Sequence, residues 1–297
     1  MNLAPKTIQI FLPGGDPRGI RVAEITTRIV QVIEVPRSLL SEFLKMPESG
    51  QVALYFLVGA TEDGTEQQVY IGQTGDLHTR LATHNKEKDF WERVLVLISR
   101  TNNLTQTHAL YLEWHCLQSA RTAGRYAIAN GNSGSKPHTP PPLEADCLEV
   151  FDTGRTLLAT LGYPIFDPVV RSVAQPADEK VNITQSEPEE LFYCKGDGID
   201  GRGLFTTEGF VVLKDSIGRR ENSPSINPSF IQLRLRLIES GTIRENGSQL
   251  VFTKDHLFPS PSTAAVSLAG RNSNGWTMWR NKAGKTLDEL KRQTVTP

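Results

Sequence analysis

The sequence predicts a protein of mixed helices and strands, α/β or α+β in class, built from several parts. Three observations predict this: short β-branched and apolar runs typical of strands, longer stretches typical of helices, and changes of net charge along the chain. The 297 residues are enough for two domains. The composition, 38% hydrophobic and 22% charged, permits a sizeable core.

Residues 1–50 predict an N-terminal β arm. Residues 7–11 alternate polar and apolar side chains, as a strand does. Residues 20–35 are rich in β-branched side chains and predict one or two further strands. Residues 38–43 predict a short helix.

Residues 51–168 predict a central domain, a small antiparallel sheet flanked by helices. Its first part is a hairpin, in which an apolar strand at 52–58 and a second strand at 69–72 are joined by a polar turn. A helix follows at 77–84, for which Asp76 is the expected N-cap.

The rest of the central domain predicts one more strand and two helices. Residues 94–98 form an apolar run that predicts a strand buried on both faces. Residues 105–123 contain no internal glycine or proline and predict a helix. Residues 143–161 predict another, broken around Gly154.

The remaining residues predict an acidic linker at 169–194 and a basic α+β domain at 195–297. Net charge is +1 over residues 1–50, −3 over 51–150, −4 over 151–194 and +5 over 195–297. The basic end is where attraction to a polyanion is expected, although an unevenly charged solvated surface gives the same sum. The expected strands lie near 204–206, 209–213 and 250–252, and the expected helices at 229–239 and 262–268.

Membrane insertion and cysteine chemistry are not indicated. No apolar run approaches the ~18 residues that span a bilayer, and the first residues lack the apolar stretch of a signal peptide. We therefore expect a cytoplasmic protein with no membrane partner. The three cysteines are widely spaced with no CxxC, so neither a disulfide framework nor a zinc site is indicated.

One carboxylate of the helix at 105–123 stands out. Ala109, Glu113, Cys116 and Ala120 follow the spacing of one helical face, so Glu113 lies on a mostly small, apolar stripe. A buried carboxylate needs a partner. Periodicity alone favours an arginine at the sheet edge, and a divalent cation is the alternative, since Mg²⁺ takes one or two protein carboxylates plus substrate phosphate.

The hairpin carries two tyrosines, Tyr55 and Tyr70, each inside an apolar run. If the strands pair, the rings can lie side by side with their hydroxyls at the rim. Taken alone, this pattern is more typical of core packing with a polar handle than of catalysis. Arg80 lies on the next helix, where a lone arginine is usually solvated.

Together these residues resemble the motif series of the GIY-YIG nucleases. The chain has Ala53-Leu54-Tyr55, then Tyr70-Ile71-Gly72-Gln73-Thr74, Arg80, His84-Asn85, Glu113 and a later asparagine. Tyr70-Ile71-Gly72 matches literally, whereas Ala53-Leu54 stands where the family has Gly-Ile. The resemblance covers about 85 residues, and the ordered set is far more specific than Tyr-Ile-Gly alone.

The resemblance implies a role for each of these residues. Glu113 would bind Mg²⁺ (or Mn²⁺) beside the scissile phosphate, and Tyr55 or Tyr70 would position or deprotonate the attacking water. Arg80 would neutralise charge developing on the phosphate, and Asn130 or Asn132 would close the family pattern. This fits the needs of phosphodiester hydrolysis: an activated water, stabilisation of extra negative charge, and a Lewis acid.

The resemblance also bears on Gly72, Gln73 and His84. Several family members carry a lysine directly after Tyr-Ile-Gly, and this chain has Gln73, which removes one cation that would favour a tyrosinate. Gly72 and Gln73 are expected to lie against the substrate. His84 is a candidate base or phosphate ligand, and a helix-end histidine bonded to the backbone is the alternative.

The C-terminal part resembles a domain of unknown function often fused to GIY-YIG nucleases, over roughly residues 200–290. The resemblance rests on the segments 209–213, 260–265 and 274–276. Trp276 and Trp279, with Arg271, Arg280 and Lys282 nearby, predict either an aromatic and basic surface for nucleic acid or a tryptophan core with a basic rim. Trp276 and Arg280 are the expected substrate contacts.

The leading hypothesis is therefore a metal-dependent DNA endonuclease with a basic accessory domain that contacts DNA. A second is a catalytically weak or inactive DNA-binding protein that keeps the nuclease fold, motivated by Gln73 and the degenerate first half of the motif. A third is an interaction module that binds a protein partner, or forms a homodimer, through the proline-rich loop near Pro140 and the acidic linker.

Overall fold

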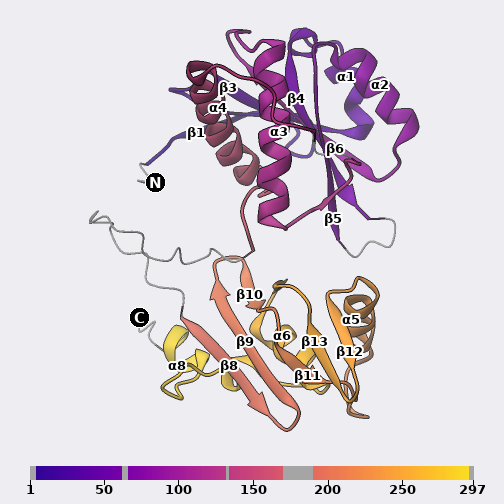
Figure 1. The fold of residues 1–297 in the computed structure, drawn as a ribbon, viewed down its shortest axis with the longest axis vertical. Helices are drawn as coiled ribbons and strands as arrows, with labels where there is room; N and C mark the ends of the chain where they lie inside the picture. The colour runs from indigo at the N-terminus through magenta and orange to yellow at the C-terminus, as the bar shows by residue number, and fades with distance from the viewer. Residues whose placement is uncertain (1–4, 62–65, 132–133, 170–189, 294–297) are drawn as a thin grey trace. The chain divides into compact units, whose positions relative to one another are not determined.

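The chain forms two compact units, residues 1–168 and 169–297. The computed structural model describes residues 5–61, 66–131, 134–169 and 190–293. Each unit is built on its own seven-stranded sheet (Figure 1). Helices and strands are mixed in both units, so the α+β class predicted from the sequence is confirmed.

The sheet of the first unit has the strand order β1-β2-β3-β6-β4-β5-β7. All neighbours are antiparallel except β5 and β7, which run parallel. The strands are β1 (Ile8–Phe11), β2 (Arg21–Ile25), β3 (Val30–Pro36), β4 (Ala53–Ala60), β5 (Gln67–Thr74), β6 (Trp91–Ser99) and β7 (Ala127–Ile128).

Helices cover both faces of this sheet (Figure 1). One face packs against α1 (Leu40–Phe43), which follows the 3-10 turn Arg37–Leu39, and against α2 (Leu77–Glu87). The other face packs against α3 (Gln106–Ala123) and α4 (Pro141–Thr160). A second 3-10 turn, Pro47–Gly50, leads into β4. Strand β4 is buried on both faces because its side chains alternate between these two cores.

The N-terminal strands belong to the same sheet as the motif-bearing hairpin. Strand β3 pairs along its whole length with β6, which in turn pairs with β4. Strands β1, β2 and β3 are therefore part of the central sheet and do not form a separate arm. The sequence could not reveal this, because the pairing joins strands that are about 60 residues apart in the chain.

Helix α4 is continuous through Gly154, where the sequence predicts a break. A Cβ on Gly154 would lie 2.3 Å from Leu97 Cδ1 on β6. The glycine therefore lets the helix approach the sheet closely, and the packing more than offsets its low helix propensity.

The second unit has the strand order β12-β13-β11-β9-β10-β14, with β8 also paired to β9. The strands are β8 (Leu191–Gly196), β9 (Ile199–Thr206), β10 (Gly209–Val212), β11 (Ile217–Arg219), β12 (Ile243–Asn246), β13 (Gln249–Phe252) and β14 (His256–Phe258). The helices are α5 (Pro228–Glu239), α6 (Pro261–Ala269), α7 (Gly275–Met278) and α8 (Leu287–Lys291). Helix α6 is buried along its length and supplies much of the core.

The predicted linker overlaps this unit. Strand β8 begins at Leu191, so a boundary placed before Lys195 falls inside a strand. Residues 170–189, which hold most of the predicted linker, lie outside the described residues. Within the described part of the chain, no helix combines the length and apolar character that crossing a bilayer requires.

Candidate active site

Strands β4 and β5 place two tyrosines on the same face of the sheet. Tyr55 lies opposite Gly72 and Leu57 lies opposite Tyr70, so the tyrosines are diagonal neighbours with ring centroids 6.2 Å apart. Gly72 makes room for them, because a Cβ there would lie 2.5 Å from Tyr55 Oη and 3.0 Å from Tyr70 Cε1. The glycine of the Tyr-Ile-Gly motif is thus required by the position of the first tyrosine.

Helix α2 supplies an arginine and a histidine to the two tyrosines. Arg80 and His84 are four residues apart and therefore share one helical face. Arg80 Nε donates to Tyr55 Oη at 3.1 Å, and Arg80 Nη2 donates to Tyr70 Oη at 3.4 Å. His84 Nε2 lies 2.9 Å from Tyr55 Oη. The helix is fixed at its start by Asp76, whose carboxylate accepts from the Thr79 backbone N–H, as its N-cap role predicts.

Burial decides the charge states of this group. The Tyr55 side chain is fully buried, and burial raises its pKa well above the ordinary value. Burial, together with the charges of Arg80 and Lys88, lowers the pKa of His84 to about 4. His84 is therefore neutral at pH 7, and its Nε2 can accept the Tyr55 hydroxyl proton while Tyr55 Oη accepts from Arg80. His84 Nδ1 is buried with no hydrogen-bond partner among the described residues.

Tyr70 differs from Tyr55 in exposure. It is partly exposed, whereas the expectation of two hydroxyls at the rim fails for Tyr55, which α2 covers. Lys88 Nζ lies 4.6 Å from the centroid of the Tyr70 ring, a cation–π contact. Lys88 is not part of the motif series, although it follows His84 by four residues, at the C-cap of α2.

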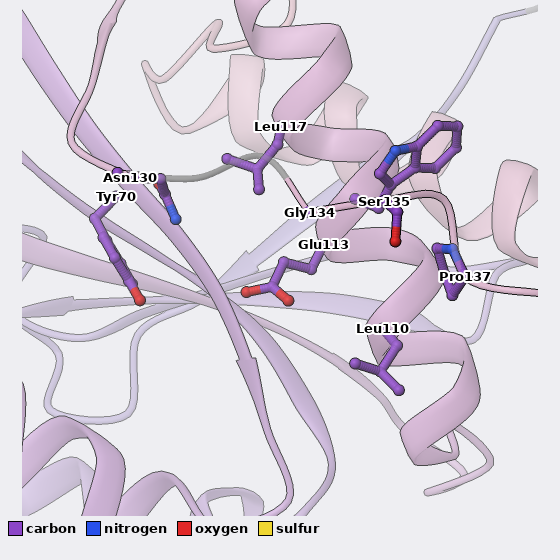
Figure 2. A pocket seen from close by; sticks show the side chains of 10 residues that line it. Tyr70, Leu110, Glu113, Leu117, Asn130, Gly134, Ser135 and Pro137 are labelled. Atoms are coloured by element: carbon purple, nitrogen blue, oxygen red, sulfur yellow. The ribbon is translucent and has the colours of Figure 1, made fainter.

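Glu113 points into a hollow of about 360 Å³ that Tyr70 and Asn130 also line. Figure 2 shows its carboxylate projecting from α3 toward Tyr70. Burial raises the pKa of Glu113, and the backbone of Gln73 and the charge of Arg80 oppose this in part. The described residues form no ion pair with Glu113, so the arginine salt bridge that periodicity favoured is not what holds it.

Asn130 completes the edge of β5. Strand β7 pairs with β5 only at Gln68 and Val69. Beyond that point the Asn130 side chain takes over, accepting from the Ile71 N–H at 3.0 Å and donating to the Ile71 carbonyl at 2.7 Å. It thus acts as a short piece of strand. The alternative candidate, Asn132, lies outside the described residues.

Gln73, next along the strand, bonds through its side chain to Gln106 at the start of α3. This fixes the position at which several GIY-YIG proteins carry a lysine. The predicted residues Tyr55, Tyr70, Gly72, Gln73, Arg80, His84, Glu113 and Asn130 are therefore all gathered around one end of β5.

The donor set fits one kind of metal ion. Among the residues that the structure describes, no three His, Cys, Asp or Glu side chains form a metal-binding group. Glu113 offers a single carboxylate that faces an open hollow. Mg²⁺ is commonly held by one or two carboxylates and completes its shell with water and substrate phosphate, whereas a structural zinc site needs four protein ligands. The residues present fit Mg²⁺ or Mn²⁺ shared with a substrate.

In the second unit, Trp276 and Arg280 have different surroundings. Trp276 packs edge-on against Phe205, and the Arg292 guanidinium lies 3.7 Å from its ring centroid. Trp279 is fully buried in the core and donates its indole N–H to the Pro261 carbonyl. Arg280 is exposed and lines a separate hollow. The sequence allowed either an aromatic and basic surface or a tryptophan core with a basic rim. Trp279 is in the core and Arg280 is at its basic rim.

Comparison with known families finds a match in the second unit. Residues 192–291 match a family described as a domain of unknown function (DUF4357), which covers nearly all of the described second unit and agrees with the resemblance seen there in the sequence. No curated protein and no solved structure matches the chain. The character of the first unit therefore rests on its motifs and its geometry.

Proposed function

We propose that the first unit is a GIY-YIG-type nuclease that hydrolyses a phosphodiester bond of DNA with Mg²⁺ or Mn²⁺. The observation that carries this is the hollow beside β5. Glu113 points into it from α3, Tyr70 lines it from β5, and Arg80 is bonded to the Tyr70 hydroxyl. These are a metal-binding carboxylate, a hydroxyl that can orient water, and a cation for the developing charge.

Glu113 would hold the metal ion, which supplies Lewis acidity and a template for the phosphate when bound. Its elevated pKa supports this role, because a carboxylate kept in a partly buried site without an ion pair gains a partner when a cation arrives.

The exposure of the two tyrosines separates their roles. Tyr70 is the group that meets water and phosphate, because it is partly exposed and lines the hollow. Tyr55 is a positioning residue, since it is fully buried and holds Arg80 and His84 in place. Arg80, which is exposed and bonded to both hydroxyls, is placed to neutralise charge on a phosphate beside Tyr70.

Lys88 supplies the positive charge that several GIY-YIG proteins carry at the position of Gln73. A lysine after Tyr-Ile-Gly would place a cation beside the tyrosines. Here the cation comes from the end of α2, with Lys88 Nζ over the Tyr70 ring. The contact holds a positive charge beside the ring of Tyr70.

The test is cleavage of supercoiled plasmid by the full chain with Mg²⁺ or Mn²⁺, with and without EDTA. We expect metal-dependent nicking that Glu113→Gln abolishes and Glu87→Gln leaves unchanged. Glu87 is a matched control because it is an exposed glutamate of α2, in the same unit. Equal cleavage by wild type and Glu113→Gln would show that the activity does not come from this site.

A second candidate is a DNA-binding protein that keeps this arrangement without turnover. The full burial of Tyr55 and the tie between Gln73 and Gln106 favour it, because both fix groups that a nuclease site would use freely. Salt-dependent gel shifts of DNA with no product under any divalent metal would favour this candidate over the nuclease.

A further inference from the structure

We propose that a basic hollow in the second unit, separate from the site beside β5, binds single-stranded nucleic acid. The hollow measures about 690 Å³ and lies between β8, the segment after α6, and the chain from α7 to Gly284. The inference does not rest on nuclease activity, since it concerns binding by another unit.

Four cations and no acidic residue line this hollow. They are Lys195, Arg271, Arg280 and Lys282, and all four are exposed. None of them takes part in the ion pairs found among the described residues. A concave site lined by one sign of charge concentrates ligands of the opposite sign. Its ligand is therefore an anion with several charges, as a phosphodiester chain is.

Two of the acids near the hollow are engaged in structural contacts. Glu190 accepts from the side chain of Asn281, at the rim of the hollow, at 2.7 Å. Glu289 forms the capping box of α8 with Thr286, whose hydrogen bonds lower the pKa of Glu289, and the charge of Arg280 lowers it further. These acids fix the rim, and the lining itself stays basic.

The frame of the hollow is held by the backbone before any ligand binds. Arg280 and Tyr193 exchange two backbone hydrogen bonds, of 2.7 and 2.9 Å. The Arg280 guanidinium donates to the Gly284 carbonyl at 3.0 Å. Asn281 and Lys285 close the intervening loop, with the Asn281 N–H bonded to the Lys285 carbonyl. Such preorganisation reduces the loss of conformational freedom on binding.

An aromatic ring and a thioether give the hollow an apolar part. Tyr193 is partly exposed and lines it together with Met278, and Lys195 Nζ lies 5.8 Å from the Tyr193 ring centroid. Cations that track a backbone, next to a ring on which a base can stack, are the features of single-strand binding. In a duplex the bases are stacked inside and cannot enter a hollow, so the single-stranded form is favoured.

The experiment is fluorescence anisotropy with a labelled oligothymidylate of roughly 15 nucleotides, using the full chain in EDTA so that no cleavage occurs. We expect Arg271→Ala and Lys282→Ala each to weaken binding severalfold and to reduce the slope of log affinity against log salt by about 0.7 per lost phosphate contact. Arg244→Ala is the matched control, because Arg244 is an exposed arginine of β12 outside the hollow. Equal effects of all three variants would overturn the site.

Tyr193 tests the base-stacking part. Tyr193→Leu is expected to weaken binding about fivefold or more with an unchanged salt slope, while Tyr193→Phe keeps the affinity because it keeps the ring. Circular dichroism melting of each variant separates loss of binding from loss of folding. If Tyr193→Leu binds normally, or if a duplex of equal length binds as tightly as the single strand, the proposal of a single-strand site is wrong. Because the assay is run in EDTA and compares variants of the second unit, its outcome does not depend on whether the first unit cleaves DNA.

Discussion

Replacing Gly72 by alanine tests whether the motif glycine is required by the buried tyrosine. The new Cβ would lie 2.5 Å from Tyr55 Oη and 2.6 Å from Tyr55 Cζ. Ordinary contacts between such atoms begin near 3.5 Å, so the ring must move by about 1 Å. Tyr55 has no exposed surface, and its hydroxyl is bonded to Arg80 and His84, so this movement disturbs all three residues.

The expected effect of Gly72→Ala is a loss of about 1–3 kcal/mol in the free energy of unfolding, the usual penalty for overpacking a core. If the first unit is a nuclease, cleavage should fall by about 10²-fold, because a displacement of 1 Å in a catalytic group has an effect of that size. Urea denaturation measures the first quantity and plasmid nicking the second.

The control is Gly75→Ala, three residues further along the chain. A Cβ at Gly75 would meet only Gln106 Oε1, at an ordinary 3.6 Å. We expect this variant to unfold and cleave as the wild type does. Should Gly72→Ala match Gly75→Ala in both assays, the steric account of the motif glycine would be refuted.

Three further outcomes are expected. Glu113→Gln should raise the thermal midpoint at neutral pH while lowering cleavage by about 10²-fold or more, because the amide avoids the burial that raises the pKa of Glu113; a lower midpoint would count against this. Burial lowers the pKa of His84 from 6.5 to about 4. Between these pH values the histidine is protonated in the unfolded chain but not in the folded one. The free energy of unfolding should therefore fall by about 2 kcal/mol through this residue from pH 7 to pH 5; an equal fall in His84→Gln, measured by urea denaturation at both pH values, would contradict it. Lys88→Met should slow nicking about two- to fivefold, the size of an exposed cation–π contact, and Lys86→Met should not; equal rates would remove Lys88 from the site.

Local patterns in the sequence could predict which of these residues lie together, and the resemblance to a motif series is what marked them as a candidate site. Alternation within two paired strands sets Tyr55 and Tyr70 on the same face, and the four-residue spacing of Arg80 and His84 sets both on one side of α2. Local sequence patterns do not determine how deeply a side chain is buried. Whether a tyrosine is covered depends on how α2 lies over β4 and β5, a packing of separate elements.

Long-range pairing and weak patterns account for the remaining differences in the fold. The joining of β3 to β6 depends on contacts between distant segments. Strands β11 and β12 are short and polar or glycine-containing, so neither shows the alternation by which strands are recognised. Gly154 reads as a helix breaker until the proximity of Leu97 is known. In each case the deciding quantity is a contact outside the local window.

The edge of β5 bears on the proposal that Glu113 binds a cation. Two successive groups satisfy this edge beyond β7: the Asn130 amide, bonded to Ile71, and the Glu113 carboxylate, which the Gln73 backbone stabilises. At Asn130 a neutral amide satisfies the backbone groups of Ile71 without burying a charge. A carboxylate at the next position carries an unfavourable desolvation, seen in its raised pKa, that a glutamine would avoid. A residue that is worse for stability than an available alternative, and that faces an open hollow, supports the proposal that a cation binds there, because a cation stabilises a partly buried carboxylate that has no ion pair.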